Sequence, residues 1–289
     1  MDFGLSVEQQ TWYDATIAFA NERLAPELNL AMRDSEAEFW REGWRRCGEF
    51  GLHGLPVPTE YGGKGLGLPE TIAAMEGLGY ACEDNGLIFA INASLWTNTI
   101  PVLRYGTDAQ KTRWLPLLSC GTVVGANGAS EPEAGSDIFG LRTRATKTES
   151  GWVLNGCKTW VTAGPVADVF VCYATSDPAK GVLGISAFIV PKETAGFRVV
   201  RDIPKLGPCI GHTTHFSSSQ PSARLAPAWL HASSMAKSSP STHATSTSNG
   251  GYSTRSVPLA FTSSSFTRPT IFPSLMVINS APSHGTCRC

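Results

Sequence analysis

The sequence predicts an α+β protein: a helical part, then an antiparallel, barrel-like β part, then an irregular tail. Three observations lead to this prediction. Apolar residues recur with helical spacing up to about residue 120, and short β-branched runs replace them from about residue 121. From about residue 216 the chain is rich in serine. We therefore expect a helical domain over 1–120, a β domain over 121–215 and a tail without a packed fold over 216–289.

A series of amphipathic helices is expected in the first part. Ser6 suits the N-cap of the first, which carries Trp12, Ala15 and Phe19 and which we expect to end at Pro26. The second helix stops near Gly51. The second helix carries Trp40, Trp44 and Cys47 on one face, and a third is marked by Ile72, Met75, Gly79 and Cys82. A fourth, marked by Leu87, Ile91, Leu95 and Val102, is apolar nearly all round and is expected to be buried. Thr107 caps a last helix, in which Trp114 and Leu118 are expected to point inward.

The β part is expected to consist of short strands separated by turns. Asn155–Gly156 lies in the middle of one β-branched stretch, WVLNGCKTWV. This dipeptide predicts a hairpin, because it suits the two positive φ angles of a type I′ turn.

Composition limits the classes of protein that this chain can belong to. The chain has 289 residues, 42% of them hydrophobic, which is enough for a packed core and argues against general disorder. A net charge of −1 gives no basic face for nucleic acid, and no apolar run reaches the length of a membrane span. The eight cysteines have no framework spacing, and the amino terminus resembles no leader. We therefore expect a cytoplasmic protein.

Three short motifs have competing interpretations. The glycine-rich segment 61–67 is interpreted as a turn, since no strand precedes it as a dinucleotide loop requires. The segment 130–137 is either a solvated turn or a polar-ligand site. Trp160 and Thr162 alternate onto one face of a strand, where they suit either a flat heteroaromatic ligand or a core position. The pattern Cys209, His212, His215 lacks further metal ligands, so no metal site is predicted.

Seven sequence blocks occur in the order and at the spacings of one enzyme family. They are MDFGLSVEQQ, PTEYGGKGLG, YGTDAQKTRWLPLLSCG, SEPEAGSD, LNGCKTWVTAGPVAD, AFIVPKETAGF and KLG. Over about residues 1–215 they resemble the amino-terminal and middle domains of the acyl-CoA dehydrogenases. The resemblance implies an FAD enzyme that oxidises an acyl-CoA thioester to its 2,3-enoyl form, with electrons passing to an electron-transfer flavoprotein type of acceptor. It implies a third, carboxy-terminal domain of four helices.

The resemblance also assigns site residues. The positions that correspond to flavin contacts are Asn127, Ala129, Ser130, Trp160 and Thr162. Ser136 corresponds to a contact with the CoA part of the substrate. Asn127 departs from the aromatic residue often found there, and Ser130 replaces a common threonine but keeps the hydroxyl. Glu131 and Glu133 correspond to no catalytic residue and are interpreted as structural. Helix 87–105 is expected to line the acyl cavity, where Trp96 either shortens the cavity or belongs to the core.

The resemblance ends after Gly207. In the family the carboxy-terminal domain carries the catalytic glutamate and builds the oligomer, so neither a base nor an oligomer is predicted here. All 24 acidic residues lie at or before Asp202. A reading-frame shift near His215 explains this change. Back-translation of 235–252, read in another frame, allows GQVFAQHPCYFNIERWL, which resembles a helix of that domain. A natural serine-rich extension is the alternative.

Three functions follow from these observations. The chain is an acyl-CoA dehydrogenase by descent, a non-catalytic fragment that retains FAD poorly, or a scaffold that binds acyl-CoA or flavin and carries an interaction tail. A visible flavin spectrum, and its bleaching by acyl-CoA, separate the three hypotheses. The length of the acyl chain cannot be read from the sequence.

Overall fold

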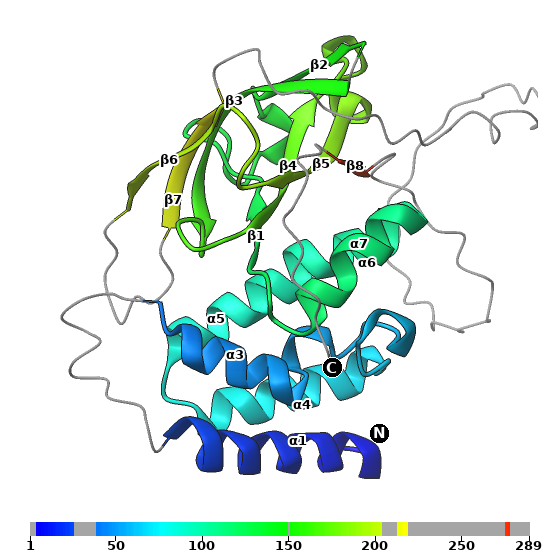
Figure 1. Ribbon diagram of the computed structural model, residues 1–289, viewed down its shortest axis with the longest axis vertical. Coiled ribbons are helices and arrows are strands. Elements are labelled where there is room, and N and C mark those ends of the chain that lie inside the picture. The colour runs from blue at the N-terminus through cyan, green and yellow to red at the C-terminus, as the bar shows by residue number, and fades with distance from the viewer. Residues whose placement is uncertain (1–3, 26–38, 150, 204–212, 219–274, 278–289) are drawn as a thin grey trace, which may run out of the picture.

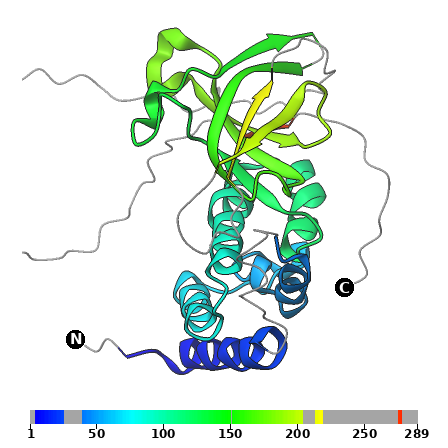
Figure 2. The same cartoon turned by 90° about the vertical axis from the view of Figure 1, so that its left-hand side faces the viewer.

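The protein has helices at one end and a β-sheet at the other, as Figures 1 and 2 show. The computed structural model describes residues 4–25, 39–149, 151–203, 213–218 and 275–277. The predictions about Pro26, about Cys209 and His212, and about nearly all of the tail therefore lie outside the described residues. Helix α1 lies farthest from the sheet, and the helical run that begins with α5 lies nearer to it (Figure 1).

The first helix begins where the sequence predicted. Ser6 caps α1 (Val7–Phe19), and Gln9 completes a capping box, with Ser6 Oγ accepting from Gln9 N at 3.2 Å. The π-helical turn η1 (Ala20–Leu24) continues it. Helix α3 (Arg41–Phe50) ends at Gly51, which has a φ of 101° as a left-handed cap requires. Two short 3₁₀ turns, η3 (Leu52–Gly54) and η4 (Thr59–Tyr61), then lead through the predicted glycine-rich turn.

The helix that Ile72, Met75, Gly79 and Cys82 mark is present as α4 (Leu68–Ala81), but these residues do not share one buried face. Met75 is buried, but Ile72 is 51% exposed and Gly79 is also exposed. The contact with α1 depends on a glycine, since a Cβ on Gly77 would lie 2.5 Å from the main-chain oxygen of Tyr13. This glycine allows the two helices to approach closely. The spacing of apolar residues therefore predicts the helix but does not identify its buried face.

The buried helical run predicted over 87–105 is confirmed. It comprises α5 (Asn85–Ser94), the π-helical turn η5 (Leu95–Thr99) and α6 (Ile100–Tyr105). The 21-residue stretch 85–105 passes a length-and-hydropathy test for a membrane span, contrary to the expectation from sequence, but half of its tested window is buried inside the protein. Its packing against β1 identifies it as a core helix. Thr107 caps α7 (Asp108–Ser119), with Trp114 and Leu118 buried as predicted.

The sheet is mixed, not antiparallel throughout as the sequence suggested. Its strands in the described part of the chain are β1 (Gly125–Gly128), β2 (Arg144–Thr148), β3 (Gly151–Thr162), β4 (Val169–Thr175), β5 (Ile185–Pro191), β6 (Phe197–Asp202), β7 (Thr213–Ser218) and β8 (Leu275–Val277). Their order is β6-β7-β3-β2-β4-β5-β8. β1 lies off this path and pairs with β4 in parallel.

The predicted hairpin at Asn155–Gly156 is wrong. Strand β3 runs straight through both residues, and its pairing with β2 aligns Asn155 with Arg144. A Cβ on residue 156 would lie 2.3 Å from Thr143 Oγ1, so the glycine is required by a close approach of the chain and not by a turn.

One hydrophobic cluster joins the helices to the sheet. It contains Ile91 and Leu95 of the buried helical run together with Ala126, Phe170 and Phe188 of the sheet. A second cluster packs α7 onto β4 and β5 through Trp114 and Val171. Because apolar contacts cross the boundary, the two parts form one packed unit in which the helices fix the sheet's position.

Candidate active site

The first group of predicted flavin contacts lies at the end of β1, on the side of the sheet that meets the helices. Asn127, Ala129 and Ser130 are all half-buried. Asn127 donates from Nδ2 to the main-chain oxygen of Thr97 at 2.8 Å, which holds β1 against the π-helical turn η5. The main-chain groups of this segment are therefore fixed by neighbours on both sides.

Trp160 lies on a bulge of β3. The pairing of β3 with β7 shifts register between Lys158 and Val161, and Trp160 takes a φ of +57° within that shift. Ala163 has the same positive φ. Such angles are costly for residues other than glycine and concentrate at functional sites. The indole is 59% exposed, whereas Val161 beside it is fully buried. Trp160 is therefore a strained, exposed aromatic side chain and not a core tryptophan.

The structure brings this bulge next to the end of β1. The main-chain N–H of Thr159 donates to the carbonyl of Ser130 at 2.9 Å, and Lys158 Nζ donates to the carbonyl of Ala129 at 3.1 Å. Ala129 and Ser130, two of the predicted contacts, directly follow β1 and therefore lie against the residues that precede Trp160. Thr162 is half-buried one residue beyond Val161.

Glu131 and Lys158 form a buried ion pair that sequence reasoning missed. Their side chains are 5% and 1% exposed, and Lys158 Nζ lies 2.8 Å from Glu131 Oε1. Burial acts to raise the pKa of Glu131, but hydrogen bonds from Lys158, Thr143 and the main chain of Arg142 outweigh it and lower that pKa. Burial lowers the pKa of Lys158, against the opposing effect of Glu131.

The solvated-turn interpretation of 130–137 therefore holds only for its later residues. Ser136 is exposed in the turn that follows, and no hydrogen bond among the described residues links it to the flavin positions. Glu133 is also exposed and pairs with Arg142. A signal for the buried pair was present in the sequence: a lysine in the middle of an otherwise half-buried strand needs a partner.

An apolar groove lies on the helical part. It has a volume of about 630 Å³, and the residues that line it are Leu68, Ile72, Met75, Glu76, Asn92 and Trp96. Trp96 is half-buried and donates from Nε1 to Asn92 Oδ1 at 3.1 Å. Helix 85–105 thus contributes to this groove through Trp96 and Asn92 and contacts β1 through Asn98.

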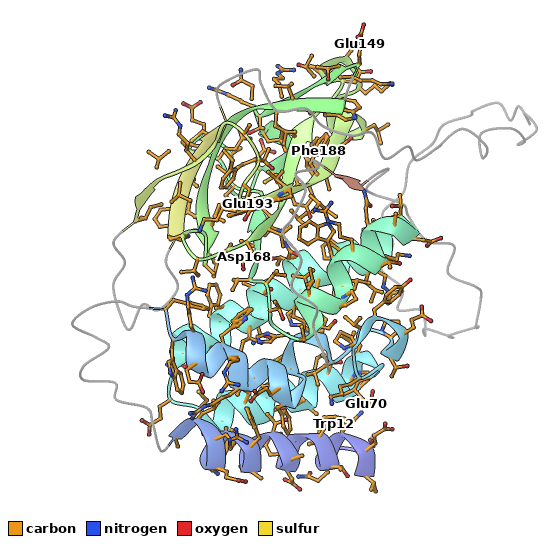
Figure 3. All side chains as sticks on the ribbon, viewed as in Figure 1. Trp12, Glu70, Glu149, Asp168, Phe188 and Glu193 are labelled. Atoms are coloured by element: carbon orange, nitrogen blue, oxygen red, sulfur yellow. The ribbon has the colours of Figure 1, made fainter. Side chains whose placement is uncertain are left out.

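Asp168 lies between the helices and the sheet, as Figure 3 shows. Its Oδ2 accepts a hydrogen bond from Val124 N at 2.8 Å. Burial raises the pKa of this carboxyl, and the Val124 hydrogen bond opposes the rise. Asp168 fixes the start of β1, so the position of the site's first segment is determined by a structural carboxylate.

Comparison with known sequences decides the family. Residues 6–122 match the model of the acyl-CoA dehydrogenase N-terminal domain, and residues 126–217 match that of the middle domain. The chain belongs to the acyl-CoA dehydrogenase family. Within this family it is 38% identical over 205 residues to an L-prolyl-[peptidyl-carrier protein] dehydrogenase of a Serratia species, covering 71% of this chain and 53% of that one.

Other relatives give the same result. The mitochondrial isovaleryl-CoA dehydrogenase of Pongo abelii is 39% identical over 206 residues, which cover 71% of this chain and 48% of that protein. The solved FAD complex of PigA is 36% identical with a TM-score of 0.72, covering 76% of this chain and 57% of that one. The chain spans about half the length of these curated relatives. The order of a helical part followed by a sheet, predicted from the sequence, is the order of the family.

Proposed function

We propose that the end of β1 and the bulge of β3 bind the isoalloxazine ring of FAD. The observation that carries the proposal is Trp160, an exposed indole on a strained bulge, beside main-chain groups of Ala129 and Ser130 that the structure holds in place. A flat heteroaromatic ring needs an aromatic surface and polar groups around its edge, and these residues supply both. The PigA structure was solved with FAD, which supports the choice of flavin.

Each residue has a stated part in this proposal. The indole of Trp160 packs beside the ring, and Thr162 and Ser130 contribute hydroxyl groups to its polar edge. Asn127 and Ala129 contribute main-chain groups, while the Asn127 side chain remains bonded to Thr97. Ser136 contacts the CoA part of the substrate from its exposed turn.

The reaction that we propose for the complete protein is dehydrogenation of an acyl thioester. FAD, when bound, accepts the hydride that leaves the β-carbon. The apolar groove lined by Ile72 and Trp96 holds the acyl chain. A carboxylate base is needed to remove the α-proton. We expect this base on the family's carboxy-terminal domain, which residues 216–289 do not resemble, so we propose that the 289-residue chain binds flavin weakly without turnover.

A thioester on a carrier protein is a second candidate substrate. One of the relatives is named as a prolyl-[peptidyl-carrier protein] dehydrogenase and has about the same identity to this chain as the isovaleryl-CoA enzyme. Both substrates present a thioester, and the comparisons do not separate them.

Flavin titration tests the proposed site. FAD is added to the purified chain, and quenching of flavin fluorescence is followed, with Trp160→Gly as the variant. We expect the wild-type chain to quench the fluorescence and the variant to need about tenfold more protein. Equal titration curves would contradict the proposed site. Competition by an acyl-CoA or by an acylated carrier protein then identifies the substrate class.

A further inference from the structure

We propose that the buried ion pair of Glu131 and Lys158 has a positioning role. It holds the segment 129–131, which follows β1, next to the β3 bulge at Trp160. The proposed flavin contacts on these two segments then face the same ligand. Neither residue is proposed to touch the flavin. The inference rests on the proposed flavin site, because that site gives the positioned residues their function.

Lys158 connects the β3 bulge to the segment 129–131. Its Nζ donates to the carbonyl of Ala129 at 3.1 Å and to Glu131 Oε1 at 2.8 Å, so one ammonium group holds both residues that flank Ser130. The main-chain N–H of Thr159 donates to the carbonyl of Ser130 at 2.9 Å, which adds a third bond between the two segments. Three bonds therefore fix the segment 129–131 against Lys158 and Thr159, the two residues that directly precede Trp160.

Glu131 also binds the segment that enters β2. Its carboxylate accepts from the main-chain N–H of Thr143 at 3.0 Å, from the Thr143 hydroxyl and from the main-chain N–H of Arg142. Thr143 in turn accepts from Thr175 N at 2.9 Å. The carboxylate thus joins the end of β1 to the chain that enters β2 and, through it, to β4.

Burial makes this arrangement specific. A pair that is 5% and 1% exposed gains little in net stability over apolar residues of the same size, because both charges lose their hydration. The charges do require fixed partners, so few alternative positions of the segment satisfy them. The strained φ of +57° at Trp160 follows directly after this fixed point, so the bulge starts from a set position.

Hydrogen exchange on the full chain tests this role without any ligand. The main variant is Lys158→Met with Glu131→Gln, which removes both charges and leaves no lone buried charge. The amide of Thr143 then bonds to a neutral acceptor, and the amide of Thr159 bonds to a Ser130 carbonyl whose neighbours Lys158 no longer holds, so both amides are expected to exchange about tenfold faster. The amides of β4 are expected to exchange at the wild-type rate.

The matched control is Arg142→Met with Glu133→Gln, which removes an exposed ion pair from the same part of the chain. Its exchange pattern and flavin affinity are expected to stay at the wild-type values. If the main variant fails to fold, Thr143→Val replaces it, because it removes the hydroxyl bond to the Glu131 carboxylate and leaves both charges paired. A smaller increase at the same two amides is expected.

Flavin titration of the same proteins gives the second readout. The main variant is expected to bind FAD about tenfold more weakly at an unchanged denaturation midpoint. Exchange that is unchanged, or faster by the same factor throughout β4, would overturn the inference. Failure of the wild-type chain to bind FAD would overturn the proposed function instead, and the exchange data would still decide whether the pair positions the segment.

Discussion

Asn98 donates from Nδ2 to the main-chain oxygen of Ala126 across 2.8 Å, and this bond joins the buried helical run to β1. The same nitrogen lies 3.4 Å from the carbonyl of Val169 on β4. Asn98 is fully buried, and a Cβ on Gly125 would lie 2.7 Å from its Cγ. One side chain therefore holds a helix against the strand that leads to the proposed flavin contacts.

Replacement of Asn98 by alanine is expected to lower the free energy of unfolding by about 1–3 kcal/mol, because buried carbonyls lose their donor. Urea denaturation measures the loss. The matched control is Asn92→Ala, whose amide bonds only within its own helix, to Ile88 and Trp96. That variant is expected to lose less than about 1 kcal/mol. Equal losses would show that Asn98 does not join the two parts.

His53 makes stability depend on pH. Burial lowers its pKa from 6.5 to about 4, against a hydrogen bond with the Trp44 carbonyl that acts to raise it. Between these two values the unfolded chain binds a proton that the folded chain excludes. The free energy of unfolding therefore falls as the pH drops through this window, by about 2 kcal/mol from about pH 7 to about pH 4.5.

The variant His53→Gln isolates that contribution. Wild type and variant are denatured with urea at both pH values, and the difference between the two pH values is compared. We expect this difference to be smaller in the variant by about 2 kcal/mol. Carboxylates titrate in both proteins and cancel. The same pH dependence in both would contradict the burial of a neutral imidazole.

Trp160 is expected to serve the ligand and not the fold. Trp160→Gly removes the positive-φ strain but makes the unfolded chain more flexible, so the free energy of unfolding should change by less than about 1 kcal/mol. Trp152, on the same strand, packs on Phe188 at a ring distance of 5.8 Å. Trp152→Ala should cost roughly 2–4 kcal/mol without a direct effect on flavin contacts. Urea denaturation and FAD titration measure both variants. A large loss of stability in Trp160→Gly, or unchanged stability in Trp152→Ala, would contradict these roles.

The exposed apolar side chains of α4 are expected to bind a hydrophobic dye. Leu68 and Ile72 are 58% and 51% exposed beside the groove. A double change to glutamine should reduce dye fluorescence clearly and leave the denaturation midpoint in place. Val200→Gln, at a similarly exposed site on β6, is the control and should leave dye binding unaltered. Equal fluorescence in all three proteins would contradict a dye site at the groove.

Local signals in the sequence predicted the helices well. The capping box at Ser6, the left-handed cap at Gly51 and the buried run 87–105 follow from interactions between residues close in the chain. The hairpin failed for the opposite reason. Gly156 is needed because Thr143, thirteen residues earlier, approaches it, and no local pattern contains that contact.

The candidate site divides in the same way. Trp160, Thr162, Asn127, Ala129 and Ser130 came from a family resemblance, and their roles toward flavin remain predictions. The ion pair of Glu131 and Lys158 was missed because the two residues lie far apart in the sequence and only the contact of β3 with the segment after β1 brings them together. Cytoplasmic localisation also stays a prediction, and cell fractionation tests it.

Anaerobic mixing of the FAD-loaded chain with an acyl-CoA thioester tests the central claim most directly: residues 127–162 form one side of a flavin site, and the proton acceptor lies outside this chain. The visible absorption band of the flavin is followed after mixing. The account predicts that the protein perturbs the band and that the thioester does not bleach it. Bleaching accompanied by enoyl-CoA formation would show that these 289 residues already contain the base, and would contradict the account.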